Sequence, residues 1–168
     1  GETRDWIENL DDLPHPAWDL LDLSPYRLPL SGKPFVLLTP HRGCPWKCTY
    51  CTAPSYYGNK IRTRSVENVV AEIKNLKENY GIEDFFMWSD TFTGNKRYVR
   101  ELCKAITPLN IRWTCNSRVD TFDEELGNYM KKAGRDSFSR SGFLGQILPK
   151  EARQEYLVPG KHITQNSM

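Results

Sequence analysis

The sequence has almost no net charge, no long apolar run and only five cysteines, an odd number. It balances 23 Lys and Arg against 21 Asp and Glu, so charge gives no reason to expect nucleic acid as a partner. No apolar stretch approaches the roughly 18 residues that span a bilayer, so no membrane segment is expected. The polar start does not have the pattern of a secretory signal. We therefore expect a cytoplasmic protein whose cysteines are thiols or metal ligands, because disulfides are rare in reducing compartments.

Prolines interrupt the first part of the chain. Five of the eleven prolines lie within residues 1–34, and proline breaks helices and is excluded from central strands. This composition predicts a proline-rich linker or arm. Its Trp and Leu side chains favour an arm that lies against another surface, with a short helical turn at 17–21.

A regular pattern of apolar residues begins at residue 35. Three short apolar runs are typical of buried strands, and three segments with apolar residues at helical spacing are typical of helices. The strands are expected at 35–39, 85–88 and 111–116, and the helices at 65–80, 95–106 and 121–130. Because strands and helices alternate, the sequence predicts an α/β fold with a parallel sheet.

Three cysteines closely follow the first predicted strand. Cys44, Cys48 and Cys51 have the spacing C-x3-C-x2-C. A structural zinc site needs four protein ligands, and His41 is the nearest candidate for the fourth. A four-iron cluster held by three thiolates instead keeps one iron open, where a substrate or cofactor can bind. Gly43 is expected to help form the tight turns that direct three sulfurs inward.

Polar residues follow the other two predicted strands. Ser89 and Asp90 end the second strand, and Asn116 and Arg118 follow the third. Because ligands of parallel sheets bind at the carboxyl ends of the strands, these residues are candidates for a shared site. Asp90 could accept a charge-assisted hydrogen bond from an ammonium group. Arg118 could pair with the carboxylate of a ligand, or with an aspartate two or five residues further along the chain.

Taken together, these residues resemble the radical S-adenosylmethionine (radical SAM) enzymes. The resemblance rests on the cysteine spacing after the first strand, with the aromatic Tyr50 just before the third cysteine. The segments at 13–21, 42–45, 88–93 and 113–120 are similar to the subclass that carries a cobalamin-binding domain upstream. The resemblance implies a partial (β/α) barrel of the radical SAM type, with about three βα units.

The resemblance also implies cofactors, partners and roles. The three cysteines would hold a 4Fe-4S cluster, whose open iron binds S-adenosylmethionine. Tyr50 would lie near the adenine or shield the cluster from water, and Ser89 and Asp90 would bind the methionine amino group. Asn116 and Arg118 complete the expected cofactor-binding set. Reductive cleavage of S-adenosylmethionine would drive radical chemistry on a small molecule, with cobalamin as methyl carrier in this subclass. A one-electron donor such as flavodoxin or ferredoxin is the implied partner.

Other cysteines and basic residues have plainer expectations. Cys103 and Cys115 occupy apolar helix and strand positions and are expected in the core. His41 is expected to be structural rather than catalytic. Arg62 and Arg64 could approach a phosphate or cofactor, but a solvated loop is the expectation.

The regular pattern stops after residue 134. The barrel of the family has more βα units than three, so we expect a truncated domain. The expected organisation is an arm at 1–34, the first half of a radical SAM barrel at 35–134 and an irregular, poorly ordered tail at 135–168. A short helix near 150–156 is the one element that the tail suggests.

Three hypotheses about function follow. The first is a radical SAM enzyme that transfers a methyl group to a small molecule or modifies it in a related way. The second is a catalytically inactive fragment that binds a cluster. The third hypothesis is a methylthiotransferase acting on RNA. It is the weaker alternative, because the sequence has no basic stretch with interleaved aromatics.

Overall fold

A three-stranded parallel sheet forms the centre of the structure, a computed structural model that describes residues 5–28 and 32–134. The strands lie in the order β1-β4-β5, and both pairs are parallel. The elements of the βα series are β1 (Phe35–Leu38), α2 (Val66–Tyr80), β4 (Asp84–Met87), α3 (Lys96–Ile106), β5 (Arg112–Cys115) and α4 (Glu124–Ala133). All six agree with the predicted elements to within a few residues at each end.

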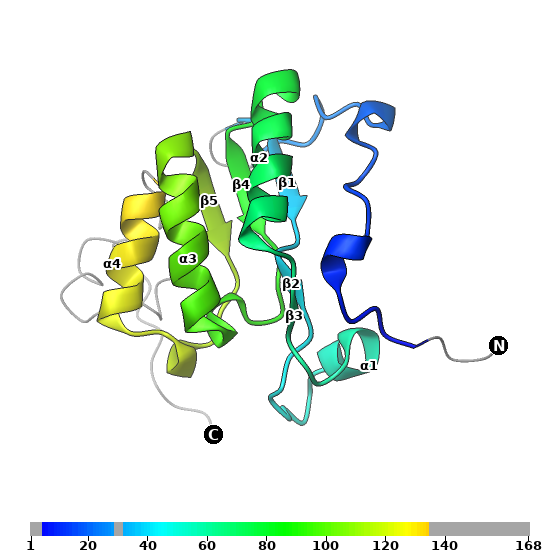
Figure 1. Ribbon diagram of the computed structural model, residues 1–168, viewed down its shortest axis with the longest axis vertical. Coiled ribbons are helices and arrows are strands. Elements are labelled where there is room, and N and C mark those ends of the chain that lie inside the picture. The colour runs from blue at the N-terminus through cyan, green and yellow to red at the C-terminus, as the bar shows by residue number, and fades with distance from the viewer. Residues whose placement is uncertain (1–4, 29–31, 135–168) are drawn as a thin grey trace, which may run out of the picture.

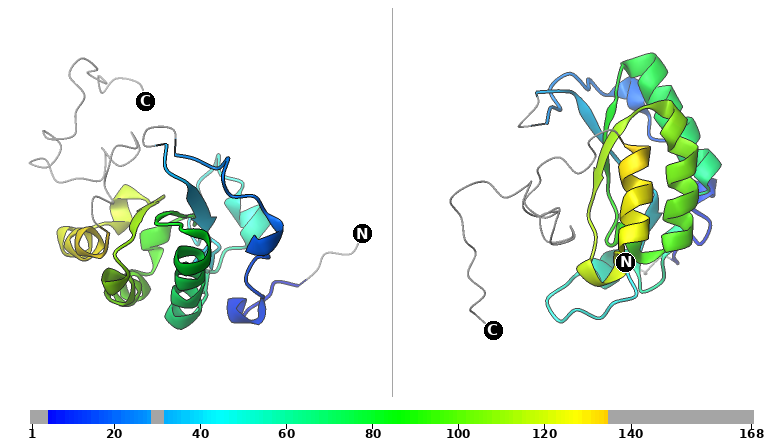
Figure 2. Two further views of the ribbon diagram at one scale, coloured as in Figure 1. Left: turned by 90° about the horizontal axis from the view of Figure 1, so that it is seen from above. Right: turned by 90° about the vertical axis from the view of Figure 1, so that its left-hand side faces the viewer.

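The three helices α2, α3 and α4 all lie on one face of the sheet (Figures 1 and 2). The parallel strands also follow one another across the sheet in chain order. Barrel folds have this arrangement, whereas doubly wound sheets reverse strand order and carry helices on both faces. The predicted α/β fold with three βα units is therefore confirmed over the described residues.

Each of the helices α2, α3 and α4 begins at a side chain that accepts a backbone hydrogen bond. The Ser65 hydroxyl accepts from the N–H of the third residue along the chain at 3.1 Å, and Asn95 and Asp123 do the same for α3 and α4. Such caps satisfy backbone donors that the first turn leaves unpaired. Gly81 ends α2 with φ of 66°, a left-handed conformation that glycine adopts without strain. The helix predicted at 65–80 agrees with these two ends of α2, whereas the helix expected from residue 121 begins only after Asp123.

The core lies between the sheet and the helices. Val36, Leu38, Phe85 and Met87 alternate along their strands and are buried against the helices. The strands were predicted to be buried, but residues on the opposite face of the sheet are partly exposed. Leu37, for example, is 54% exposed. No element among residues 5–28 and 32–134 covers that face, so only every second residue of β1 and β5 is buried, whereas Asp84 and Phe85 are both buried at the start of β4.

Several short elements were not predicted. A two-stranded antiparallel ladder pairs residues 41 and 42 with 63 and 62, and a five-residue helix lies inside the loop that this ladder closes. These elements are β2 (His41–Arg42), α1 (Ala53–Tyr57) and β3 (Arg62–Thr63), with the 3-10 turns η1 (Leu10–Asp12), η3 (Phe92–Gly94), η4 (Thr107–Leu109) and η5 (Val119–Thr121). A further 3-10 turn, η2 (Trp18–Leu20), was expected. Two-residue strands have no periodicity that a sequence could show.

The arm packs against α2 and the segment before it (Figure 1). Trp18 is buried, and its Nε1 donates to Glu72 Oε1 at 3.0 Å. Glu72 Oε2 in turn lies 2.5 Å from Arg64 Nη1, with both side chains largely buried. The Asp11 carboxylate accepts from the backbone N–H of Ser65 at 2.9 Å. The helical turn expected at 17–21 is present as η2, whereas the tail expected at 135–168 lies outside the described residues.

Helices of the described segments are all too short or too polar to cross a bilayer.

Replacement of Glu72 by Ala tests the contact between the arm and α2. The change leaves the Arg64 charge and the Trp18 N–H without their buried partner, so we expect a loss of about 3 to 5 kcal/mol in unfolding free energy. Urea denaturation measures this loss. The matched control is Glu101→Ala, which breaks the exposed Arg97–Glu101 pair and should cost no more than about 1 kcal/mol. Equal losses in both variants would show that the buried network does not hold the arm.

Candidate functional site

The three cysteines lie on one loop between β2 and β3. Pairing of Arg42 with Arg62 closes the loop at its base. Inside the loop, the N–H of Cys44 donates to Gly58 O at 3.2 Å, and the N–H of Cys51 donates to Cys48 O at 3.1 Å. The loop starts shortly after β1, at the carboxyl end of the parallel sheet.

Gly43 makes the entry into this loop possible. Its φ is +94°, which side chains disfavour, and a Cβ there would lie 2.1 Å from Lys60 O. The close approach of the two ends of the loop therefore requires glycine at this position. The sequence predicted a turning role for Gly43, and the structure confirms it.

The three thiols differ in depth. Cys44 is buried with its Sγ 3.6 Å from Thr91 Oγ1, Cys48 is half-buried, and Cys51 is exposed. None of them forms a disulfide. Cys48 Sγ accepts a hydrogen bond from Arg118 Nη1 at 3.2 Å. The loop thus offers three free sulfur donors, with a cationic group beside one of them.

The described residues are not arranged around a single metal ion. Among the residues that the structure describes, no three His, Cys, Asp or Glu side chains are gathered to hold one ion, so the zinc alternative with His41 is not supported. A four-iron cluster binds each thiolate at a different iron, and its ligands need not meet at one point. Three free thiols on one loop fit that donor set.

His41 is a core residue, as expected. It is fully buried, its Nε2 lies 3.2 Å from the accepting carbonyl oxygen of Phe92, and its ring stacks on the Phe92 ring. Burial lowers the pKa of His41 to about 4, although the hydrogen bond to Phe92 favours protonation. The imidazole is therefore neutral at physiological pH.

Asp90 lies beside the cysteine loop. Its Oδ2 accepts from the backbone N–H of Gly43 at 3.2 Å, which joins the end of β4 to the residue before Cys44. Burial raises the pKa of the Asp90 carboxyl, and the bond from Gly43 opposes this in part. Ser89 is 1% exposed, and its hydroxyl has no hydrogen-bond partner among the residues that the structure describes. Both residues are placed where the sequence predicted, at the carboxyl end of the second parallel strand.

Asn116 and Tyr50 have different surroundings. The carbonyl oxygen of Asn116 accepts from Phe92 N at 3.0 Å, so it joins the loops that follow β5 and β4. Tyr50 is 89% exposed, and its ring shields nothing in the described part of the chain. Their predicted contacts with a cofactor stay predictions.

Arg118 forms the ion pair that the sequence offered as one of its two roles. Its Nε and Nη2 donate to the two carboxylate oxygens of Asp120 at 2.9 and 2.6 Å. The hydrogen bond with Asp120 raises the pKa of Arg118, and Arg118 lowers the pKa of Asp120. The guanidinium also lies over the Trp46 ring, 5.1 Å from its centroid. The role of Arg118 at a cofactor carboxylate stays a prediction.

The expectation of a solvated loop for Arg62 and Arg64 is wrong. Arg62 is 6% exposed and donates to Ile7 O and Tyr57 O at 2.6 and 2.8 Å, while Arg64 forms the buried pair with Glu72. Arg62 thereby contacts the arm at Ile7, a contact between distant segments that local sequence does not show, while Arg64 lies against α2. By contrast, Cys103 and Cys115 are buried in the core, as predicted.

Comparison with known families identifies the class of this fold. The model of the radical SAM superfamily matches residues 38–141. The Uncharacterized methyltransferase PH0819 of Pyrococcus horikoshii is 38% identical over 133 residues, which are 78% of this chain and 28% of that protein. Cytidylyl-2-hydroxyethylphosphonate methyltransferase of Streptomyces wedmorensis is 33% identical over 134 residues, which are 74% of this chain and 25% of that protein.

A solved structure supports the same fold. The radical S-adenosylmethionine methyltransferase TsrM of Kitasatospora setae, with tryptophan substrate and a SAM analogue bound, matches with a TM-score of 0.56 and 22% identity. The match covers 60% of this chain and 20% of the TsrM chain. TsrM has also been solved with cobalamin and a [4Fe-4S] cluster bound.

The chain belongs to the radical SAM superfamily. Membership of this family implies a 4Fe-4S cluster and S-adenosylmethionine. The chain spans about a quarter of the length of the curated relatives it matches.

Replacement of Gly43 by Ala tests the entry into the cysteine loop. The new methyl group would meet the backbone at Lys60, which cannot rotate away. The control is Gly81→Ala, where φ is also positive but no atom lies within 4 Å, and the expected cost is about 1 to 2 kcal/mol. We expect Gly43→Ala to lose about 1 to 3 kcal/mol more through overpacking, measured by thermal or urea unfolding. Equal stability of the two variants would contradict the clash.

The pH dependence of stability tests the burial of His41. The pKa of His41 is about 4 in the folded chain and about 6.5 when unfolded, so the unfolded state binds the extra proton between these values. Stability therefore falls as pH drops from 6.5 to 4, by about 3 kcal/mol from this residue. Urea denaturation of the wild type and His41→Gln measures the difference. A wild-type profile parallel to that of the variant across this range would contradict the shift.

Proposed function

We propose that this chain is part of a cobalamin-associated radical SAM methyltransferase that acts on a small molecule. One observation carries the proposal: three free cysteines share one loop at the carboxyl end of the sheet, and the loops after β4 and β5 both contact it. These contacts are the Asp90–Gly43 and Arg118–Cys48 hydrogen bonds. Ligands of such sheets bind at this edge.

In this proposal, Cys44, Cys48 and Cys51 hold a 4Fe-4S cluster. When reduced, such a cluster supplies the electron that splits S-adenosylmethionine into methionine and a deoxyadenosyl radical, which starts the radical chemistry. The protein positions the reactants and excludes competing reactions. A one-electron donor such as flavodoxin or ferredoxin would reduce the loaded chain.

Residues at the ends of the strands would hold S-adenosylmethionine. Asp90 would accept hydrogen bonds from the methionine ammonium, and Ser89 has an unpaired buried hydroxyl beside it in the chain. Asn116 would contact the cofactor from the loop after β5. Tyr50 is exposed and free to close over the adenine.

Methyl transfer and the use of cobalamin are proposed from the relatives. The two relatives described above carry methyltransferase names, and TsrM has been solved with cobalamin, which supports methyl transfer and a cobalamin partner domain. We also propose the division into an arm at 1–34 and the first half of a barrel at 35–134. A location in the cytoplasm belongs to the same proposal.

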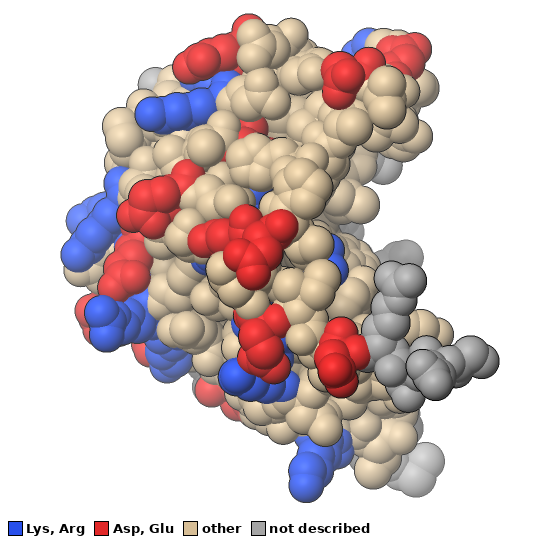
Figure 3. Space-filling model, turned by 45° about the vertical axis from the view of Figure 1, so that its right-hand side comes forward, with Lys and Arg blue, Asp and Glu red and all other residues tan. Residues whose placement is uncertain are grey.

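A non-catalytic function is the second candidate. The chain spans about a quarter of its relatives' length, so it could hold a cluster without turning over a substrate. RNA methylthiolation has less support, because acidic and basic side chains are interspersed on the face shown in Figure 3. A surface that binds RNA electrostatically would carry clustered basic residues.

Cluster reconstitution in cysteine variants tests the ligand assignment. We expect the 168-residue chain to gain visible iron–sulfur absorbance after anaerobic reconstitution, and Cys44→Ala, Cys48→Ala and Cys51→Ala to lose most of it. Cys103→Ala is the matched control, because this thiol is buried in the core. Retained absorbance in all three loop variants would contradict the assignment.

The same preparation separates the two candidate functions. After addition of dithionite and S-adenosylmethionine, formation of deoxyadenosine supports the enzyme. A loaded chain that forms no deoxyadenosine supports the cluster-binding fragment, and a chain that takes up no cluster contradicts both.

A further inference from the structure

Arg118 reaches the cysteine loop from a distant part of the chain. Its Nη1 donates to Cys48 Sγ at 3.2 Å, across a separation of 70 residues in sequence. The guanidinium lies over the Trp46 ring, which belongs to the cysteine loop itself. Arg118 therefore contacts the loop in two ways, through a sulfur atom and through an aromatic face.

Asp120 fixes the orientation in which the Arg118 guanidinium makes this hydrogen bond. The two carboxylate oxygens accept from Nε and Nη2 of Arg118. Because the guanidinium is planar, this paired contact sets the plane and leaves Nη1 for the sulfur. An arginine whose only partner was solvent would have no such preferred orientation.

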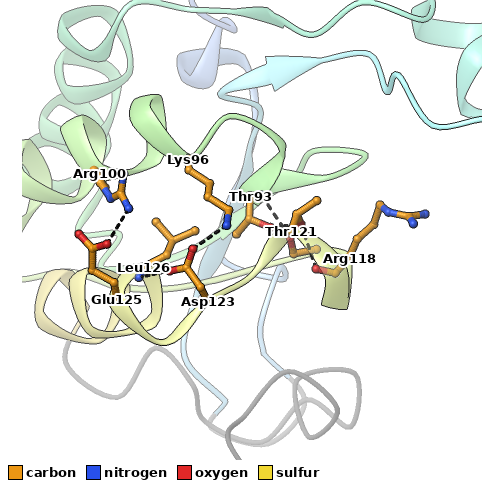
Figure 4. Close-up of polar contacts among 9 residues, drawn as sticks. Thr93, Lys96, Arg100, Arg118, Thr121, Asp123, Glu125 and Leu126 are labelled. Carbon is orange, nitrogen blue, oxygen red and sulfur yellow. Dashed lines mark hydrogen bonds and ion pairs between the residues drawn. The ribbon is translucent and has the colours of Figure 1, made fainter.

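The backbone of Arg118 is held as well. Its carbonyl oxygen accepts from Thr121 Oγ1 at 2.9 Å, and Thr121 is joined at 2.5 Å to the hydroxyl of the fully buried Thr93. The Thr93 hydroxyl is also hydrogen bonded to Ser117. Thr93, Ser117 and Thr121 form a hydroxyl cluster that joins the loops after β4 and β5. In Figure 4 the side chain of Arg118 extends away from this cluster.

We infer that Arg118 is a positioning residue that sets the reduction potential of a cluster held by the loop, acting through the sulfur of Cys48. This inference rests on the proposed function, because it takes Cys48 as a cluster ligand. Hydrogen bonds to ligand sulfurs, local charge and solvent exposure set the potentials of iron–sulfur clusters. A cationic donor at a sulfur favours the state with one more electron, so it raises the potential.

Substitution of Arg118 by Met tests the inference on the reconstituted chain without S-adenosylmethionine. The variant loses the charge and the donor but keeps apolar bulk over Trp46. We expect the equilibrium constant for reduction to fall at least tenfold, which is a shift of about 59 mV to lower potential for one electron. A redox titration followed by absorbance or electron paramagnetic resonance measures it. Arg118→Lys keeps the charge without the planar fork and should give an intermediate potential.

The control is Arg97→Met, which removes the same charge from an exposed pair on α3. Its potential should stay close to that of the wild type, because water and salt screen a charge whose side chain is 88% exposed. Equal potentials in the wild type, Arg118→Met and Arg118→Lys would overturn the inference and leave the ligand assignment intact. Loss of the cluster from both Arg118 variants, with circular dichroism unchanged, would also overturn it, since Arg118 would then be needed for loading. A wild-type chain that takes up no cluster would overturn the proposed function itself.

Discussion

Parallel pairing of β1 with β4 and of β4 with β5 brings three distant segments to one edge of the sheet. The cysteine loop follows β1, Asp90 follows β4 and Arg118 follows β5. Each segment alone is a polar loop with no evident partner. Side by side, they connect through the Gly43–Asp90 and Cys48–Arg118 hydrogen bonds. The site is thus a consequence of strand register, because a change of pairing would move its parts away from one another.

Closure of the cysteine loop depends on a second set of contacts outside the sheet. The β2–β3 ladder joins the two ends of the loop, and Gly43 allows its backbone to pass close to Lys60. Arg62 then fixes the ladder to the arm through Ile7 O. The arm therefore supports the base of the cysteine loop through β3. Structural support of this kind keeps ligands in place without taking part in chemistry.

Much of the fold could be predicted from the sequence, because local signals specify it. Apolar spacing gave the three strands and three helices, and Ser65 and Gly81 marked the ends of α2. The turning role of Gly43 followed from its place before three clustered cysteines. Side-chain exposure was harder to predict: Leu37 lies in an apolar run that reads as buried on both faces, yet nothing in the described chain covers it.

Contacts between distant segments could not be predicted in the same way. The Cys48–Arg118 bond and the Arg64–Glu72–Trp18 network link residues whose proximity depends on the complete fold. The ion pair of Arg118 with Asp120 could be predicted, because only two positions in the sequence separate the partners. Whether a contact could be predicted therefore depended on how far apart its two residues lie in the sequence, and not on their residue types.

The graded depth of the cysteine loop makes its thiols unequal toward oxidants. Susceptibility of a thiol to oxidation follows its exposure and thiolate character. Exposed Cys51 meets dissolved oxygen or peroxide first, while buried Cys44 is screened by the polypeptide. If the three cysteines hold a cluster as proposed, damage at Cys51 alone would be enough to prevent loading in air, with the other two sulfurs still intact. The extent of exposure to air during purification would then determine what fraction of the protein can bind a cluster.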